Sequence, residues 1–271
     1  MMKRIELWNV YVMRKILLFF IIGLFVASNA DMVKIKMTID NVERYALVYP
    51  GEKAATEATP VVLAFHGYGT NAIQMSYYDI HLEWPEATVV YPQGYKCGNR
   101  MKDGWQHALG ENGDRDVKFV GELLKEIKKR YKVDSTRIYA TGMSNGALFC
   151  YVLMAEMPDT FAAYAPVCGA SQLMEKIDTP RPMMFIFGAK DTNMPISWGL
   201  WVLQYAKKLN SCNDNRTEWL PGYFLYSPIN KTGCKLIWRV HPDGHIWPND
   251  ATENIVRFFK GEKLADDQVD D

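Results

Sequence analysis

The sequence lacks any excess of charge of one sign. Its 271 residues include 31 lysines and arginines against 31 aspartates and glutamates, so the formal net charge is zero. Proteins that bind nucleic acid through phosphate contacts carry a basic excess, which this chain does not have. Repeats, low-complexity segments and a Pro- or Gly-rich linker are also missing from it. We therefore expect a globular protein with no nucleic-acid partner.

A long hydrophobic run is missing too. The uncharged stretch from Ile16 to Ala27 has 12 residues, whereas a membrane-spanning helix needs about 20. Basic residues precede it, and small residues follow at Ser28 and Ala30, the two positions that signal peptidase recognises at its cleavage site. We expect residues 1–30 to be a signal peptide and the protein to be secreted without a membrane anchor. Their removal takes away four basic residues and one acidic residue, leaving 27 against 30, a net charge of −3.

The 241 residues that remain after position 30 suit one domain, so residues 31–271 are predicted to form a single catalytic domain. The five cysteines are Cys97, Cys150, Cys168, Cys212 and Cys234. A disulfide between Cys212 and Cys234 is expected, because these two flank a polar, turn-rich excursion in a chain bound for an oxidising compartment. Cys150 and Cys168 lie in apolar surroundings and are expected to be buried. No Cys/His spacing resembles a zinc site, so we expect neither a metal nor a cofactor.

A Gly-x-Ser-x-Gly motif is centred on Ser144. A β-rich run precedes it at residues 137–141 and an apolar, helix-forming segment follows it. This strand–turn–helix context is typical of a nucleophile elbow, where a base and backbone N–H groups can both reach the serine. Gly142 and Gly146 are expected because side chains at these points would crowd the turn. We predict that Ser144 is a nucleophile.

The candidate base comes from a short inventory of histidines, namely His66, His81, His107, His241 and His245. In α/β hydrolases the acid and then the histidine follow the serine, which removes the first three. His245 lies in a Gly- and Pro-rich loop after an apolar strand, where a catalytic imidazole is expected. His241 ends that strand and is interpreted as structural.

The candidate acid is Asp191. It follows the continuous apolar run at residues 183–188, which suits the middle of a parallel sheet. An aspartate here could also cap a turn. Asp214 and Asp243 are alternative acids, but neither follows a strand so directly.

A His-Gly loop at residues 66–72 follows another buried-type strand at residues 61–65. This is the expected position of one oxyanion donor, which we assign to the backbone of Tyr68, with the second at the backbone of Asn145. The same letters read Gly-x-Gly-x-x-Ala, a weak dinucleotide-binding fingerprint. That alternative needs an acid after a second strand, and none of Asp79, Glu83 and Glu86 follows a convincing strand.

The predicted strands lie near residues 61–65, 88–91, 137–141, 183–188 and 236–240, and a helix is predicted over 116–131 from its apolar spacing. Alternating strands and helices indicate a mostly parallel central sheet with helices on both faces. Active residues then gather at the carboxyl ends of the strands.

Several blocks together resemble one family, the α/β-hydrolase group of secreted feruloyl esterases, acetylxylan esterases and polyhydroxybutyrate depolymerases. The blocks are His66-Gly67-Tyr68-Gly69-Thr70-Asn71-Ala72, Tyr91-Pro92-Gln93-Gly94, Gly104-Trp105-Gln106, Asp116-Val117-Lys118-Phe119, the serine motif, Pro166-Val167-Cys168-Gly169, Gly188-Ala189-Lys190-Asp191 and Asp243-Gly244-His245-Ile246-Trp247-Pro248. The resemblance implies the α/β-hydrolase fold and a triad of Ser144, Asp191 and His245. The chain departs from the family at Phe187, where His is usual, and in the residues after Asp191.

The substrate is inferred less directly. Trp105, Trp198 and Trp247 lie in or beside loops that carry site motifs and could bind a phenolic acyl group or a sugar chain; each could equally be a core tryptophan. We expect a serine esterase that releases hydroxycinnamic acids from plant cell-wall polysaccharides, a feruloyl esterase. The alternatives are an acetylxylan esterase, a polyhydroxybutyrate depolymerase, a peptidase and a non-catalytic glycan-binding protein.

Overall fold

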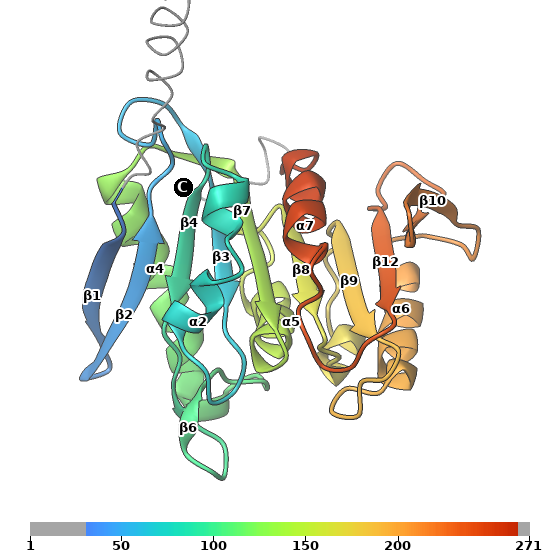
Figure 1. The fold of residues 1–271 in the computed structure, drawn as a ribbon, viewed down its shortest axis with the longest axis horizontal. Helices are drawn as coiled ribbons and strands as arrows, with labels where there is room; N and C mark the ends of the chain where they lie inside the picture. Colours follow the sequence, from blue (N-terminus) through green and yellow to red (C-terminus); the bar gives the residue numbers. More distant parts are fainter. Residues whose placement is uncertain (1–30, 265–271) are drawn as a thin grey trace, which may run out of the picture. The chain divides into compact units, whose positions relative to one another are not determined.

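A ten-stranded sheet runs through residues 31–264, the part of the chain that the computed structural model describes (Figure 1). The predicted signal peptide and the acidic C-terminal residues lie outside the described residues. In their order across the sheet the strands are β1 (Val33–Ile39), β2 (Val42–Tyr49), β4 (Thr88–Pro92), β3 (Thr59–Phe65), β7 (Val133–Met143), β8 (Ala163–Val167), β9 (Met183–Gly188), β12 (Leu236–His241), β11 (Tyr223–Tyr226) and β10 (Thr217–Leu220). No helix of residues 31–264 is long and apolar enough to cross a membrane.

The centre of the sheet is parallel and both ends are antiparallel. From β4 to β12 every neighbouring pair is parallel, whereas β1, β2, β10 and β11 pair in antiparallel fashion. The five predicted strands correspond to β4, β3, β7, β9 and β12. The predicted fold class is therefore confirmed. A separate two-stranded sheet joins β5 (Tyr95–Cys97) to β6 (Lys102–Gly104).

Helices cover both faces of the sheet. They are α2 (Ala72–Ser76), α3 (Ile80–Glu83), α4 (Arg115–Arg130), α5 (Asn145–Glu156), α6 (Ile196–Leu209) and α7 (Ala251–Lys260), with short 3-10 turns η1 (Glu111–Asp114) and η2 (Gln172–Glu175). In Figure 1, α2 and α7 lie in front of the sheet, and α4, α5 and α6 lie behind it. The helix predicted over 116–131 is α4, one residue earlier at each end.

Strand β3 shows why the central strands are continuously apolar. All seven of its residues are buried. Val61, Leu63 and Phe65 belong to the core under α4, α5 and α6, while Val62 and Ala64 belong to the core under α2, α3 and α7. Side chains alternate across a strand, so a sheet with both faces covered needs apolar residues at every position.

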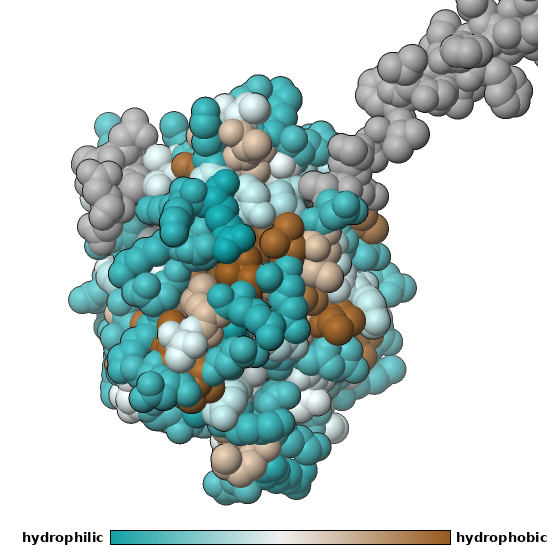
Figure 2. All heavy atoms as spheres, turned by 90° about the vertical axis from the view of Figure 1, so that its left-hand side faces the viewer, coloured by the Kyte–Doolittle hydropathy of each residue, from teal (hydrophilic) through white to brown (hydrophobic). Residues whose placement is uncertain are grey.

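The outer strand β1 is protected from pairing with another chain. Lys34 and Lys36 alternate with residues that face the core, and both lysines are exposed. Charged residues of this kind discourage edge-to-edge association of sheets. Figure 2 views this side and shows a mainly hydrophilic surface with small hydrophobic patches between polar side chains.

The predicted disulfide between Cys212 and Cys234 is wrong for this structure, in which both are free thiols. The Sγ atom of Cys212 lies 3.3 Å from the carbonyl oxygen of Cys234 and 3.5 Å from that of Tyr226. The thiol is therefore directed at the main chain and not at the partner side chain. The sequence correctly predicted that Cys212 and Cys234 lie close together, but it does not give the direction of their side chains.

Candidate active site

Ser144 occupies a strained turn between β7 and α5. Its backbone angles are φ 55° and ψ −116°, a region that residues with a Cβ rarely adopt. Its N–H donates to the carbonyl of Val167, on β8, at 2.9 Å. Such a turn lifts the serine side chain above the carboxyl edge of the sheet, as in a nucleophile elbow.

The two glycines of the motif are required by contact with backbone. A Cβ at Gly146 would lie 2.1 Å from the carbonyl oxygen of Phe65, and one at Gly142 would lie 2.6 Å from the carbonyl carbon of Gly146. Neither neighbour is a flexible side chain that could move aside. The sharp turn at Ser144 therefore depends on close approach between β3 and the start of α5.

Asp191 and His245 are joined by a hydrogen bond. The loops after β9 and β12 bring them together, and His245 Nδ1 lies 2.7 Å from Asp191 Oδ2. The other carboxylate oxygen accepts the backbone N–H groups of Asn193 and Met194, each at 2.8 Å. The carboxylate is thus fixed by the main chain and can hold the imidazole in one orientation.

The alternative acids are placed elsewhere. Asp214 pairs with Lys207 and its side chain is 90% exposed. Asp243 is also exposed, and its carboxylate lies 4.0 Å from His241 and not against His245. Among the three sequence candidates, only Asp191 contacts His245.

Ser144 and His245 open into one cavity of about 280 Å³. Its walls also include His66, Gly67, Tyr68, Thr70, Gln74, Met75, Tyr78 and Met143. Sequence reasoning missed Gln74, Met75, Tyr78 and Met143 as members of this site. The available signals were the position of α2 directly after the His-Gly loop and of Met143 directly before the serine.

The His-Gly loop is held beside Ser144 at several points. A Cβ on Gly67 would lie 3.7 Å from the Ser144 Cβ. The Thr70 hydroxyl donates to the Gly67 carbonyl at 2.7 Å, and the Tyr68 hydroxyl donates to the Cys97 carbonyl at 3.1 Å. Within residues 31–264, the N–H groups of Tyr68 and Asn145 donate to no other protein group. Both remain available to a negatively charged oxygen, as an oxyanion site requires.

The side chain of Asn145 is bonded to the backbone of Trp105 in both directions. Trp105 N–H donates to Asn145 Oδ1 at 2.7 Å, and Asn145 Nδ2 donates to the Trp105 carbonyl at 3.0 Å. The indole N–H of Trp105 donates to the His66 carbonyl at 3.0 Å. One tryptophan thus connects the start of α5 to the His-Gly loop.

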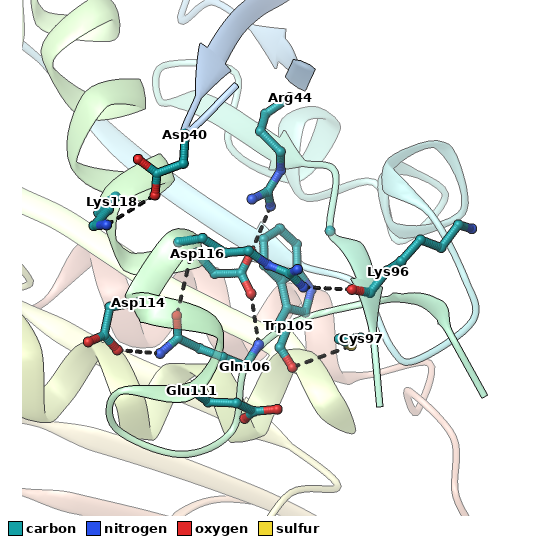
Figure 3. Close-up of polar contacts among 12 residues, drawn as sticks. Asp40, Arg44, Lys96, Cys97, Trp105, Gln106, Glu111, Asp114, Asp116 and Lys118 are labelled. Atoms are coloured by element: carbon teal, nitrogen blue, oxygen red, sulfur yellow. Dashed lines mark hydrogen bonds and ion pairs between the residues drawn. The ribbon is translucent and has the colours of Figure 1, made fainter. Parts of the chain in front are cut away.

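A buried ion pair extends this network (Figure 3). Arg44, from β2, points toward Asp116 near the start of α4, with 2.9 Å between Arg44 Nη2 and Asp116 Oδ1. The backbone N–H of Gln106 donates to Asp116 at 2.8 Å, and the N–H of Asp116 donates to the Gln106 side chain at 3.2 Å. Burial lowers the pKa of Arg44, and the Asp116 carboxylate opposes that shift. The segment that bonds Asn145 is therefore anchored to two other elements of the fold.

Two of the three tryptophans predicted to bind substrate do not reach it. Trp105 is 0% exposed and Trp247 is 7% exposed. Trp247 donates to the Thr252 hydroxyl at 3.0 Å and stacks on Tyr78 with ring centroids 4.6 Å apart. Both indoles are turned inward because each finds a polar partner there, so both predictions are wrong. Trp198 is 53% exposed and lines a second hollow.

His66 and His241 are buried, each about 1% exposed. The Gly94 N–H donates to His66 Nε2 at 2.9 Å, so the proton is on Nδ1, which donates to the Gly67 carbonyl at 2.8 Å. Burial lowers the pKa of His66 from 6.5 to about 4. A neutral His66 therefore supports the loop that carries Tyr68.

Cys168 lies beside the candidate triad. Ligand atoms of Cys168, Asp191 and His245 lie within 4.8 Å of one another. Burial and the Asp191 carboxylate raise the pKa of the Cys168 thiol to about 12, and the thiol donates to the Ile246 carbonyl at 3.3 Å. A protonated, hydrogen-bonded thiol is a poor nucleophile and a poor metal ligand. The prediction that Cys168 is a buried small residue is confirmed.

Dinucleotide binding would require an acidic residue at the end of the strand that follows the His-Gly loop, and the structure has none at that position. Strand β4 neighbours β3 and ends at Pro92, and the next residue is Gln93, whose side chain accepts from the Ala72 N–H at 3.0 Å. Asp79 and Glu83 lie at the start and end of α3 instead. Gly69 of the loop has a φ of 77°, a left-handed conformation that favours glycine, and a Cβ there would lie 3.0 Å from Lys102 Cδ.

A family model described as esterase PHB depolymerase matches residues 43–173, a range that includes Ser144. The chain is thus similar to this esterase family over 131 of its 271 residues. It is 28% identical over 140 residues to a bifunctional acetylxylan esterase/xylanase of Neocallimastix patriciarum (49% of this chain, 19% of the relative). It is 30% identical over 112 residues to feruloyl esterase B of Talaromyces stipitatus (40% and 31%). Over 114 residues it is 30% identical to poly(3-hydroxyalkanoate) depolymerase C of Paucimonas lemoignei (41% and 28%).

These matches span less than a third of each of the three relatives. Solved structures agree on the fold over a larger share of the chain. An acetyl xylan esterase from Aspergillus awamori has a TM-score of 0.63 at 15% identity, covering 84% of this chain and 99% of its own. A ferulic acid esterase has a TM-score of 0.61 at 15% identity, covering 84% and 97%. Since the family match ends at residue 173, the pairing of Asp191 with His245 is an independent observation.

Proposed function

We propose that the protein is a secreted serine carboxylic ester hydrolase with Ser144, His245 and Asp191 as its triad. The observation that carries the proposal is the 2.7 Å hydrogen bond between His245 and Asp191 at a cavity that also contains Ser144 on its strained turn. The match of residues 43–173 to the esterase family model supports the same reaction type.

The reaction follows from the roles of these groups. The Ser144 hydroxyl gives its proton to Nε2 of His245 as its oxygen attacks the ester carbonyl. The N–H groups of Tyr68 and Asn145 bind the resulting oxyanion. The alcohol leaves with the proton held by His245, and an acyl ester remains on Ser144. Water then gives a proton to His245, attacks the acyl group and releases the acid, while the proton returns to Ser144. Asp191 stabilises the imidazolium throughout.

For the acyl group we propose a hydroxycinnamoyl unit such as ferulate, carried on a plant cell-wall polysaccharide. The cavity volume of about 280 Å³ is close to the lower end of the range for small-molecule sites. Met75, Tyr78 and Met143 give it apolar and aromatic walls, and Trp247 stacks behind the Tyr78 ring and fixes it. Such walls suit a planar aromatic acid.

Acetate and hydroxybutyrate are the competing acyl groups, because relatives named for all three activities match this chain. The test compares hydrolysis of methyl ferulate, acetylated xylan and a hydroxybutyrate oligomer by the wild type and by Ser144→Ala. Ferulate release that disappears in the variant supports the triad and the acyl group. Predominant release of acetate or hydroxybutyrate refutes the proposal that the acyl group is ferulate but is consistent with the triad. Activity that survives in Ser144→Ala refutes the mechanism.

The remaining alternatives are answered by two further assays. Cleavage of a peptide amide faster than of any ester would identify a peptidase, since the triad does not by itself choose between the two bonds. Binding of a glycan without turnover of any ester would identify a non-catalytic binding protein.

A further inference from the structure

A second hollow, of about 460 Å³, lies apart from the cavity that contains Ser144. It is lined by Ala170, Ser171, Gln172, Ser197, Trp198 and Trp201. Its walls come from the loop after β8, from the start of η2 and from the first turns of α6. The volume is within the range that small-molecule sites occupy.

Both walls continue directly from elements of the candidate active site. The loop after β8 passes Ser144, because a Cβ on Gly169 would lie 3.2 Å from the Ser144 carbonyl oxygen, and Ala170 follows. On the other side, the loop that carries Asp191 runs into α6, where Ser197 and Trp198 lie. A ligand in the hollow would therefore be a neighbour of an ester held at Ser144.

The lining has the chemistry of a site for a neutral, hydroxyl-rich ligand. No lysine, arginine, aspartate or glutamate is among its residues. Trp198 and Trp201 are three positions apart on α6 and so lie on one side of it. Trp201 packs partly against the core, with its ring centroid 4.5 Å from that of Tyr205, which leaves the more exposed Trp198 for a ligand.

Polar groups surround these aromatic rings. The Ser171 side chain accepts the N–H of Leu173 at 3.2 Å, so its own hydroxyl hydrogen is free to donate. Gln172 and Ser197 are exposed and offer an amide and a second hydroxyl. A pyranose ring presents apolar C–H groups on its faces and hydroxyls around its rim. Indole rings can stack on the C–H faces of the sugar, and the amide and hydroxyl groups can form hydrogen bonds with its hydroxyls.

We infer that this hollow is a carbohydrate subsite that binds a sugar residue of a neutral polysaccharide whose ester is held at Ser144. The inference rests on the proposed esterase function and divides the substrate between two places, with the acyl group in the cavity at Ser144 and the sugar chain across Trp198.

The first test compares two ferulate esters that differ only in the alcohol, methyl ferulate and a feruloylated xylo-oligosaccharide. In Trp198→Ala we expect the KM for the oligosaccharide ester to rise about tenfold, with kcat and the kinetics on methyl ferulate within about twofold of the wild type. Leu200→Ala is the matched control, because Leu200 is 47% exposed on the same helix but does not line the hollow. It should leave both substrates within about twofold. An equal change on both esters, or no change on either, overturns the inference.

A binding experiment separates this inference from the esterase proposal. Isothermal titration calorimetry measures the binding of xylohexaose, cellohexaose and a hydroxybutyrate oligomer to the Ser144→Ala protein with and without Trp198→Ala. We expect the Kd for xylohexaose or cellohexaose to rise about tenfold when Trp198 is replaced. Binding of the hydroxybutyrate oligomer alone, or equal sugar binding in both proteins, overturns the inference whether or not the enzyme cleaves esters.

Discussion

Asn145 and Trp105 form a closed pair of hydrogen bonds, at 2.7 and 3.0 Å, between a side-chain amide and a backbone amide. The Asn145 side chain is turned away from the Ser144 cavity to make them, while its own N–H stays at the start of α5. The same residue can therefore offer a backbone donor to the substrate and use its side chain to fix where that donor lies.

Asn145→Ala is expected to lower kcat for ester hydrolysis by about 100-fold with little change in KM, because the backbone donor remains but is no longer held in place. Steady-state kinetics on methyl ferulate measure the effect. Asn210→Ala is a matched control, since Asn210 is also buried and donates to the Arg181 carbonyl at 2.6 Å on another side of the fold. It should reduce stability without lowering kcat. A fall in kcat of equal size in both variants would show that Asn145 acts only through general stability.

Asp191→Asn is expected to lower kcat on the order of 10⁴-fold, because an amide cannot hold the imidazole in the required tautomer or stabilise its positive charge. The thermal midpoint should change little, since the side chain keeps its shape. Asp243→Asn is the control; Asp243 lies two residues before His245 but its carboxylate is exposed. If Asp243→Asn were the more damaging change, the assignment of the acid would be wrong.

The unfolding free energy is expected to fall as pH drops from about 6.5 to 4. The pKa of His66 is about 4 in the folded protein and 6.5 for an unperturbed histidine, so the unfolded chain takes up a proton that the folded protein excludes in this interval. The contribution lost is about 3 kcal/mol. Urea unfolding at pH 7 and pH 4.5 measures it. His66→Gln, which keeps an acceptor for the Gly94 N–H, should show a shallower pH dependence; equal slopes in both proteins would contradict the role of His66.

The carboxyl ends of the strands were the most predictable part of the site. Asp191 and His245 were found because apolar runs buried on both faces leave a recognisable pattern, and the next polar residue must lie at the sheet edge. Strand β8 escaped prediction because its Ala-Tyr-Ala-Pro-Val sequence is alanine-rich and contains a proline. Propensity alone does not identify such a strand, which exists because β7 and β9 leave a place between them.

The tryptophans show what the sequence could not provide. Trp105 and Trp247 lie next to site motifs in the chain, but the direction of each ring is decided by tertiary partners, the His66 carbonyl and the Thr252 hydroxyl. Distance along the sequence carries no information on that direction. The walls of the Ser144 cavity were missed for the same reason, since Met75 reaches it from α2 and Tyr78 from the turn that follows α2.

Arg44→Met is expected to reduce the unfolding free energy by about 3–5 kcal/mol, because it leaves the Asp116 carboxylate buried without its partner. Lys36→Met, which breaks the exposed pair with Glu43 at 3.1 Å on the neighbouring strand, should cost less than about 1 kcal/mol. Urea denaturation of both variants compares them. Similar small losses in the two would show that the buried pair does not anchor the segment around Trp105.

Gly146→Ala is expected to destabilise the protein by about 3 kcal/mol or more and to abolish activity, because its Cβ would meet the Phe65 carbonyl at 2.1 Å, just before the His-Gly loop. Gly121→Ala makes the same chemical change within α4, where a Cβ would find nothing within 4 Å. There alanine should raise the unfolding free energy by about 0.5–1 kcal/mol, since glycine is the poorer helix former. Chemical denaturation and ester hydrolysis measured on both variants separate the two effects. An active, fully stable Gly146→Ala protein would mean that β3 and α5 do not pack as closely as the turn at Ser144 requires.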